Sequence, residues 1–314
     1  MTDNNWTKRA IQLATTTDLS WRKIALAVDV SKSTCSDALR KYFKELYKEV
    51  EPVKYTVPKT ARILLFDLET APTTAYVWGR FDQTVAQKQV VKEGYILTYS
   101  AKWLGEDTIL SNQITEAGDD TNLVKELAEL FDQADIIVAH NALRFDVPLL
   151  KTRMIALGMN PPLPSKIVDT LRIAKAEFRF PSNSLDNIAA YLGLPRKASH
   201  SGFELWTRCM AMEPEAFEEM LEYNIQDVVV LEQLYLRLRN WSKTHPNVAL
   251  LEAPGAVRCV CCGSDNLKHV EGKKFYTSTC AYELVSCDDC GKVQRQRTNV
   301  AGFDKENLLT NFSK

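Results

Sequence analysis

The sequence predicts an α/β protein with a central sheet flanked by helices, plus a small all-α module and a small β module. Strand-like and helix-like stretches alternate through residues 61–245. Three short amphipathic stretches precede this region, and six of the eight cysteines follow it, between Cys259 and Cys290. We therefore divide the chain into an all-α module (1–50), a linker (51–60), the α/β domain (61–245), a second linker (246–256), the β module (257–300) and a tail (301–314).

The composition is that of an ordinary globular protein, with 45% hydrophobic and 25% charged residues. No apolar run approaches the roughly 20 residues that span a bilayer, and the N-terminus lacks the apolar core of a signal peptide. We expect a cytoplasmic protein, or one of a host's cytoplasm, with no membrane partner. The net charge of −1 hides an asymmetry, because residues 1–50 carry nine Lys and Arg against six Asp and Glu. The middle of the chain is correspondingly acidic.

Residues 6–48 read as three short helices, the last two separated by a short turn. This pairing resembles a helix-turn-helix, in which the last helix enters the major groove of DNA. The side chains that would then face DNA belong to Lys32, Ser33, Thr34, Ser36 and Arg40. A three-helix cap without a DNA role is the alternative, because the local charge is only modestly positive.

The α/β domain is expected to begin with a strand at 62–68. Strands at 94–104 and 107–114 should be antiparallel neighbours, and a buried strand is expected at 134–140. Amphipathic periodicity predicts helices at 121–133, 147–159 and 214–241, with further structured segments at 166–176 and 183–194.

Four carboxylates and a tyrosine stand out in this domain. Asp67 and Glu69 share one strand face because side chains alternate. Asp146 follows the buried strand, and Asp227 lies on the long helix, one turn after Tyr223. Four converging carboxylates cannot all stay ionised without cations, and oxygen ligands select Mg²⁺ or Mn²⁺. Two such ions form a clamp for attack on a phosphodiester.

The stretches "FDLET", "HNALRFD" and "YNIQD" resemble the three exonuclease motifs of the DEDD superfamily, in its tyrosine subtype. The resemblance covers roughly residues 61–240. Asn141, Phe145 and Asp146 match the second motif, and Tyr223 and Asp227 match the third. This family implies a ribonuclease H-like mixed sheet and the active site of a proofreading 3′→5′ exonuclease.

The resemblance also implies residue roles. Two Mg²⁺ or Mn²⁺ ions would be bound by Asp67, Glu69, Asp146 and Asp227, while Tyr223 would orient or deprotonate the attacking water. Nucleoside 5′-monophosphates would be released. Substrate contacts would come from Thr70, Asn141, Phe145 and His200.

Alternatives remain open at several of these positions. Phe145 could equally pack in the core, and His200 could be a rival base. We expect His140 to form hydrogen bonds at a strand end. Asp169 and Asp186 should contact the metal-binding residues rather than the metal itself, or cap helices.

The C-terminal cysteines form two Cys-x-x-Cys-Gly units, Cys259 with Cys262 and Cys287 with Cys290. This spacing is typical of a structural zinc ion with four thiolate ligands and resembles a zinc ribbon. Cys261 could replace Cys262 in another register, and Cys280 lies off the pattern. Free thiols are the alternative to zinc. Basic and aromatic residues nearby suit nucleic acid, although a protein-docking role is also open.

Together these features predict a metal-dependent 3′→5′ exonuclease that acts on DNA in replication, proofreading or repair. We expect nucleic acid as its partner, DNA rather than RNA, and a separate DNA polymerase or replication protein. The combination of modules resembles a phage replication protein. An RNA-processing exoribonuclease and a catalytically inactive DNA-binding adaptor are the alternatives.

Overall fold

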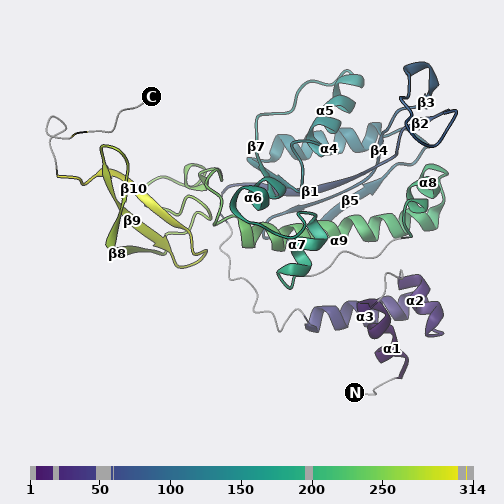
Figure 1. The fold of residues 1–314 in the computed structure, drawn as a ribbon, viewed down its shortest axis with the longest axis horizontal. Coiled ribbons are helices and arrows are strands. Elements are labelled where there is room, and N and C mark those ends of the chain that lie inside the picture. Colours follow the sequence, from purple (N-terminus) through teal and green to yellow (C-terminus); the bar gives the residue numbers. More distant parts are fainter. Residues whose placement is uncertain are drawn as a thin grey trace. The chain divides into compact units, whose positions relative to one another are not determined.

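The computed structural model describes residues 5–16, 21–46, 58, 60–194, 201–302 and 309. The chain forms two compact units. The first contains Met1–Pro52 and Ile63–Tyr235, and the second contains Val53–Arg62 and Leu236–Lys314. Figure 1 shows the elements of both units, which we describe separately. Within the described residues, no helix has the length and apolar character needed to cross a membrane.

The N-terminal segment folds as the three predicted helices, α1 (Asn5–Thr16), α2 (Trp21–Ala27) and α3 (Lys32–Leu46). Its small core consists of Ala10, Ile24, Ala25, Val28, Cys35 and Leu39. The first turn of α3 is capped by Ser31, whose Oγ accepts from the backbone N–H of Thr34 at 3.1 Å. Apolar packing and a cap therefore account for this helical segment.

One predicted DNA contact of this segment has to be corrected. Ser33 and Thr34 are exposed and Lys32 is half-buried, but Ser36 is buried. Its neighbours Cys35 and Leu39 belong to the core, so the helical period turns Ser36 inward as well. Ser36 is thus badly placed to reach a base. The side chain of Arg40 lies outside the described residues.

A five-stranded mixed sheet forms the centre of the α/β region. Its strands are β1 (Ile63–Thr70), β4 (Ile96–Trp103), β5 (Ile109–Gln113), β6 (Ile136–Ala139) and β7 (Lys166–Asp169), in the order β5-β4-β1-β6-β7. The first three strands pair antiparallel, whereas β1, β6 and β7 run parallel. This arrangement confirms the predicted α/β class and the antiparallel pairing of β4 with β5.

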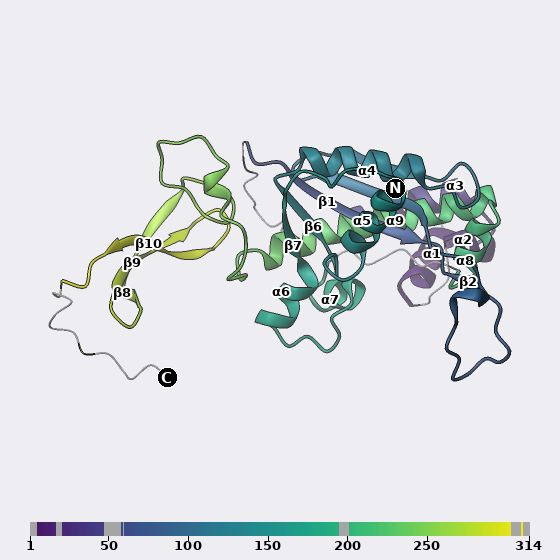
Figure 2. The ribbon, with the colours of Figure 1, turned by 90° about the horizontal axis from the view of Figure 1, so that it is seen from above.

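Helices cover both faces of this sheet. They are α4 (Thr121–Gln133), α5 (Asp146–Ala156), α6 (Thr170–Glu177), α7 (Leu185–Tyr191), α8 (Glu204–Met210) and α9 (Pro214–Leu238). In Figures 1 and 2, α4 and α5 lie on one side of the sheet and α9 runs along the other. The central strand β1 is therefore buried on both faces, which explains the apolar run that precedes Asp67.

Four short elements of the α/β region were not predicted. Strands β2 (Thr74–Ala75) and β3 (Val90–Lys92) form a hairpin, with a short 3₁₀ helix η1 (Gln87–Gln89) in its return arm. Helix α8 is the fourth missed element, and α9 ends at Leu238 rather than at residue 241. Such short elements carry too few residues to show a period.

The second unit contains an antiparallel sheet, β8 (Leu267–Tyr276), β9 (Ala281–Cys287) and β10 (Val293–Asn299), in the order β10-β9-β8. The segment predicted as a free linker at 246–256 is instead packed into this unit. It contains the 3₁₀ helix η2 (Val248–Leu250), and Val248 and Glu252 are buried. The N–H of Val248 donates to the Val260 carbonyl at 2.9 Å, so hydrogen bonds tie the segment to the cysteine region.

Candidate functional site

Three of the predicted carboxylates meet at one place. Oxygen atoms of Asp67, Glu69 and Asp227 all lie within 4.8 Å of one another. Asp67 and Glu69 project from β1 on one face, and Asp227 comes from α9, where it is only 1% exposed. Carboxylates this close repel one another, which makes the group a natural site for a divalent cation.

An amide side chain holds one of these carboxylates. Asn224 Nδ2 donates to Asp67 Oδ2 at 2.7 Å, and Asn224 is fully buried on α9. Its Oδ1 atom has no hydrogen-bond partner among the described residues. Sequence reasoning missed Asn224, although it lies within "YNIQD" and three residues before Asp227, on the same helical face. That spacing was the signal that could have identified it.

An indole holds a second carboxylate. Trp206 Nε1 donates to Glu69 Oε2 at 3.1 Å, and the Trp206 ring meets Tyr223 edge-on, with centroids 6.3 Å apart. Trp206 belongs to the unpredicted helix α8, and it is 137 residues from Glu69 along the chain. No local pattern could have shown this contact.

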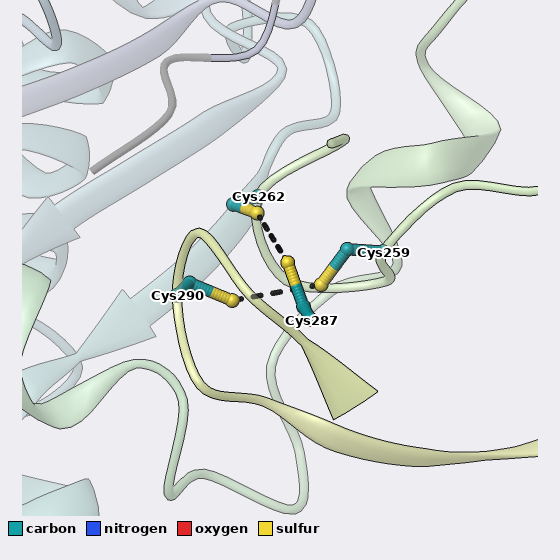
Figure 3. Close-up of side chains that lie close together, drawn as sticks. All are labelled: Cys259, Cys262, Cys287 and Cys290. Carbon is teal, nitrogen blue, oxygen red and sulfur yellow. Dashed lines mark hydrogen bonds between the residues drawn. The ribbon is translucent and has the colours of Figure 1, made fainter. Parts of the chain in front are cut away.

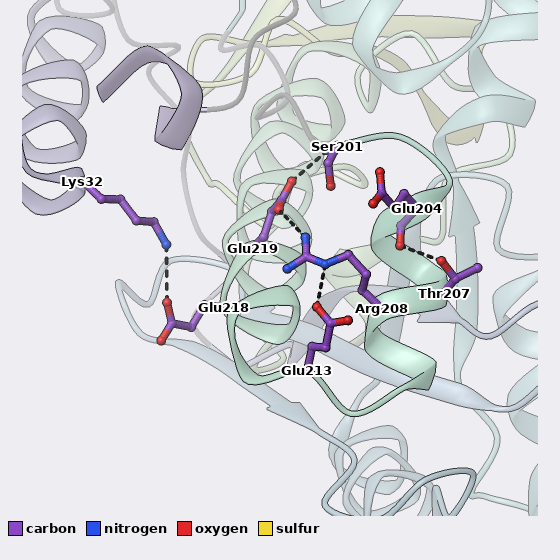
Figure 4. A network of polar contacts seen from close by, with 8 residues as sticks. All are labelled: Lys32, Ser201, Glu204, Thr207, Arg208, Glu213, Glu218 and Glu219. Atoms are coloured by element: carbon purple, nitrogen blue, oxygen red, sulfur yellow. Dashed lines mark hydrogen bonds and ion pairs between the residues drawn. The ribbon is translucent and has the colours of Figure 1, made fainter. Parts of the chain in front are cut away.

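Helix α8 is itself fixed by a polar network (Figure 4). Arg208 Nε donates to Glu213 Oε2 at 2.7 Å, and Arg208 Nη1 lies 3.8 Å from Glu219 Oε2. Glu219 also accepts from the backbone N–H of Ser201 at 2.8 Å. The nearby carboxylates raise the pKa of Arg208, led by its hydrogen bond with Glu213. These contacts join α8 to α9 and so keep Trp206 beside Glu69 and Tyr223.

Replacing Trp206 with phenylalanine should lower the rate of strand hydrolysis about tenfold. The substitution keeps an aromatic ring against Tyr223 but removes the hydrogen bond to the Glu69 carboxylate, and such charge-assisted bonds contribute about 1.5–3 kcal/mol. Steady-state kinetics on a single-stranded oligonucleotide would measure the change. Trp241→Phe is the matched control, and an equal rate for both variants would contradict a role for Trp206.

Asp146, the fourth predicted ligand, is not among the three carboxylates whose oxygens lie within 4.8 Å of one another. It is the first residue of α5, and it is buried. Burial raises the pKa of its carboxyl to about 7, and the negative charge of Asp169 acts in the same direction. Hydrogen bonds with the backbone of Asp146 and Leu68 partly oppose the shift. The contact with the Leu68 backbone places the Asp146 carboxyl next to β1, between the positions of Asp67 and Glu69. The sequence predicted that all four carboxylates converge.

Asp146→Asn should stabilise the metal-free protein above pH 7. A buried carboxyl with a raised pKa contributes most stability below its unfolded pKa, near 4, and loses that contribution as the pH rises through 7. The penalty at pH 8 is at most about 4 kcal/mol, given 1.36 kcal/mol per pKa unit. Urea unfolding in chelator at pH 5 and pH 8 would measure it. A pH-dependent loss of the same size in wild type and Asp146→Asn would contradict this account.

The other predicted residues of this region fall at or near strand ends. Thr70 ends β1 and is half-buried. Asn141 has a left-handed backbone (φ 71°), and its N–H donates to Asp169 Oδ1 at 3.0 Å. Phe145 is 47% exposed, which disfavours the core-packing alternative for this ring. His200 lies outside the described residues.

The supporting roles expected of His140 and Asp169 are confirmed, and that of Asp186 stays a prediction. His140 Nδ1 lies 2.9 Å from Thr170 Oγ1, and its Nε2 lies 2.9 Å from the Asn183 carbonyl, as expected of a strand-end hydrogen-bonder. Asp169 caps α6 by accepting from the backbone N–H groups of Leu171 and Arg172. Asp186 lies in the first turn of α7. The hydrogen bonds of His140 and Asp169 thus fix the chain that follows β6 and β7.

A second candidate metal site lies in the cysteine unit (Figure 3). Sulfur atoms of Cys259, Cys262, Cys287 and Cys290 lie within 4.8 Å of one another. The closest pairs are Cys259 with Cys290 at 3.6 Å and Cys262 with Cys287 at 3.7 Å. Hydrogen bonds from the thiols of Cys262 and Cys290 lower the pKa of Cys259, which favours the thiolate that binds a metal. Four converging sulfurs fit a tetrahedral zinc ion.

The backbone explains this convergence. Gly263 and Gly291 follow the two Cys pairs with φ of 75° and 74°, a conformation that favours glycine. Their N–H groups donate to the carbonyls of Cys259 and Cys287, which closes each turn. Cys261 is buried, but it is not in the group of four, and Cys280 lies on the β8–β9 turn. The register with Cys262 is thus the one that brings four sulfurs together.

Comparison with known proteins places the chain in a family. Residues 64–239 match the family model of the RNase_H superfamily, which covers more than half of the sequence. The chain therefore belongs to the RNase H superfamily. A stretch of 147 residues is 26% identical to the "DNA polymerase III PolC-type" of Ureaplasma parvum and covers 41% of this chain. It spans only 9% of that relative.

Among solved structures, the family B DNA polymerase from Pyrobaculum calidifontis is similar over 63% of this chain and 28% of its own, at 17% identity and a TM-score of 0.45. The superfamily match agrees with the mixed sheet and the carboxylates at the end of its central strand. This match confirms the RNase H-like fold predicted from the sequence.

Proposed function

We propose that this protein is a metal-dependent 3′→5′ exonuclease that releases nucleoside 5′-monophosphates from DNA. The observation that supports this most directly is the group formed by Asp67, Glu69 and Asp227, with Tyr223 one turn before Asp227 on α9. The superfamily membership agrees with it.

Metal binding is the first part of the proposal. Asp67, Glu69, Asp146 and Asp227 would hold two Mg²⁺ or Mn²⁺ ions, which supply a nucleophilic hydroxide and stabilise the leaving 3′ oxygen. Asn224 keeps the Asp67 carboxylate in place, and Trp206 does the same for Glu69. Both ligands are therefore oriented before a cation arrives, which lowers the cost of assembling the site.

Substrate positioning is the second part. Tyr223 orients the attacking water with its hydroxyl, and its ring is held by Trp206. The half-exposed ring of Phe145 is available to stack on a terminal base, next to Asp146. Thr70 and Asn141 contact the terminal nucleotide from the strand ends. His200 is proposed as a further substrate contact.

The flanking modules are proposed to bring DNA to this site. The N-terminal helices would contact duplex DNA through Lys32, Ser33 and Thr34 at the start of α3, with Arg40 further along. The four-cysteine unit would hold one structural Zn²⁺, since four thiolates leave no position open for water. We propose replication, proofreading or repair beside a separate DNA polymerase as the setting, inside the cytoplasm.

Cleavage of 3′-labelled single strands of DNA and RNA tests the proposal. We expect mononucleotide release from DNA with Mg²⁺ or Mn²⁺, and none with chelator. Faster release from RNA would favour the exoribonuclease alternative. DNA binding without any release, with either metal, would favour the inactive adaptor and contradict the enzyme.

A further inference from the structure

An aromatic hairpin stands next to the carboxylate site. It comprises residues 74–92, from β2 through η1 to β3, and it begins five residues after Glu69. Three aromatic side chains project from it into solvent: Tyr76 is 78% exposed, Trp78 is 99% exposed and Phe81 is 83% exposed. Figure 2 shows the hairpin extending away from the sheet and its helices, close to α8.

The conformation of the hairpin does not depend on these rings. Tyr76 N–H donates to the Gln89 carbonyl at 2.9 Å, and Gln89 Nε2 donates back to the Tyr76 carbonyl at 3.0 Å. In the return arm, the Ala86 N–H donates to Gln89 Oε1 at 2.8 Å. Polar contacts of the backbone and one glutamine hold the arms together. The aromatic side chains therefore add little to stability, and their exposure calls for another explanation.

The base of the hairpin is fixed to the strand that carries the carboxylates. Ala71 N–H donates to the Tyr95 carbonyl at 2.9 Å, and Gly94 approaches the Ala71 carbonyl so closely that an added Cβ would lie 2.9 Å from it. Nine residues separate Glu69 from Trp78, which is at most about 30 Å of extended chain. At 3.4 Å per nucleotide, that is at most about nine stacked nucleotides of a strand that ends at the carboxylates.

Charge identifies the kind of ligand. Residues 74–92 carry Arg80, Lys88 and Lys92 against a single carboxylate, Asp82, within an acidic domain. Arg80 and Lys88 are exposed, while Lys92 is engaged with the Ala117 carbonyl and the Tyr95 ring. Exposed aromatic rings interleaved with cations match a single strand of nucleic acid, whose bases stack while its phosphates meet the cations.

We infer that the 74–92 hairpin is a base-stacking platform for the single strand that feeds the carboxylate site. Tyr76, Trp78 and Phe81 stack on bases a few nucleotides from the 3′ end, and Arg80 and Lys88 contact phosphates. Because every base has a π face, such a platform accepts any sequence. This inference rests on the proposed function for its substrate, but binding tests it separately from cleavage.

The experiment measures binding of the full-length protein to a fluorescent 12-nucleotide single strand by anisotropy, in the Asp67→Ala background so that the strand survives. Combined Tyr76→Ala, Trp78→Ala and Phe81→Ala substitutions should weaken binding at least tenfold. Ile155→Ala with Leu163→Ala, which removes exposed apolar side chains outside the hairpin, should leave binding unchanged.

Two further arms separate stacking from apolar docking. Replacing the three aromatics with leucine keeps apolar bulk but removes the π faces, so it should weaken binding as much as alanine does. A 12-nucleotide abasic strand should bind the unaltered hairpin as weakly as the normal strand binds the alanine variant. Full binding by the leucine variant, or equal binding of normal and abasic strands, would overturn the inference.

The outcomes also distinguish this inference from the proposed function. Equal strand binding with and without the aromatics, together with DNA degradation by the protein that keeps Asp67, would overturn the platform alone and indicate a protein partner for the hairpin. Tight aromatic-dependent binding, together with no cleavage by the protein that keeps Asp67, would support the platform and contradict the exonuclease.

Discussion

Asp67→Ala should abolish strand hydrolysis, with a fall in rate of roughly 1,000-fold or more. Asp67 is one of three carboxylates whose oxygens lie within 4.8 Å, and Asn224 holds its side chain in place. Without the Asp67 carboxylate, the site loses a central cation ligand. This loss removes several kcal/mol of transition-state stabilisation. The rate of mononucleotide release with Mg²⁺ measures the loss. Cation binding should weaken in parallel, so the Mg²⁺-dependent rise in melting temperature should shrink.

Asp107→Asn is the matched control for this prediction. Asp107 is an exposed carboxylate between β4 and β5, away from the group of three. The Asp107→Asn variant should have a rate of mononucleotide release and a Mg²⁺-dependent rise in melting temperature close to those of wild type. Similar losses in both variants would mean that general acidity of the surface, rather than this group, supports activity.

Cys290→Ser should reduce the zinc content from about one ion per chain to near zero and unfold the cysteine unit. Its sulfur is one of four that converge, 3.6 Å from that of Cys259. Structural zinc sites contribute about 10–16 kcal/mol to the folding of small metal-binding domains, so this is the largest expected effect on stability. Metal analysis of the purified protein and circular dichroism would measure both changes.

Cys280→Ser provides the control for the zinc prediction. Cys280 lies on the β8–β9 turn, where its N–H donates to Thr277 Oγ1 at 3.1 Å, and it is not among the four grouped cysteines. It should keep full zinc content. Wild-type protein without zinc, or a Cys290→Ser variant that retains it, would contradict a structural zinc site.

The fold could be predicted largely because its signals are local. The apolar run before Asp67, the amphipathic period of α4 and the Pro at the start of α9 each fix an element within a few residues. Most strand and helix bounds agree to within a few residues. The hairpin strands β2 and β3 have only two and three residues, so no period could identify them.

The candidate site was predictable only in part. The motifs placed Asp67, Glu69 and Asp227 in one group, and the structure brings them together. Trp206 could not be found, because its contact with Glu69 joins segments 137 residues apart through an unpredicted helix. Two differences remain: Ser36 faces a core, and Asp146 is not among the three carboxylates that meet.

The polarity of degradation on a 5′-labelled single strand of DNA tests the central claim most directly. With Mg²⁺, and with Asp67→Ala as the inactive reference, the account predicts a ladder of progressively shorter labelled strands. Immediate appearance of the label as a mononucleotide would show attack from the 5′ end. That result, or cleavage of a circular strand that has no 3′ end, would contradict a 3′→5′ exonuclease.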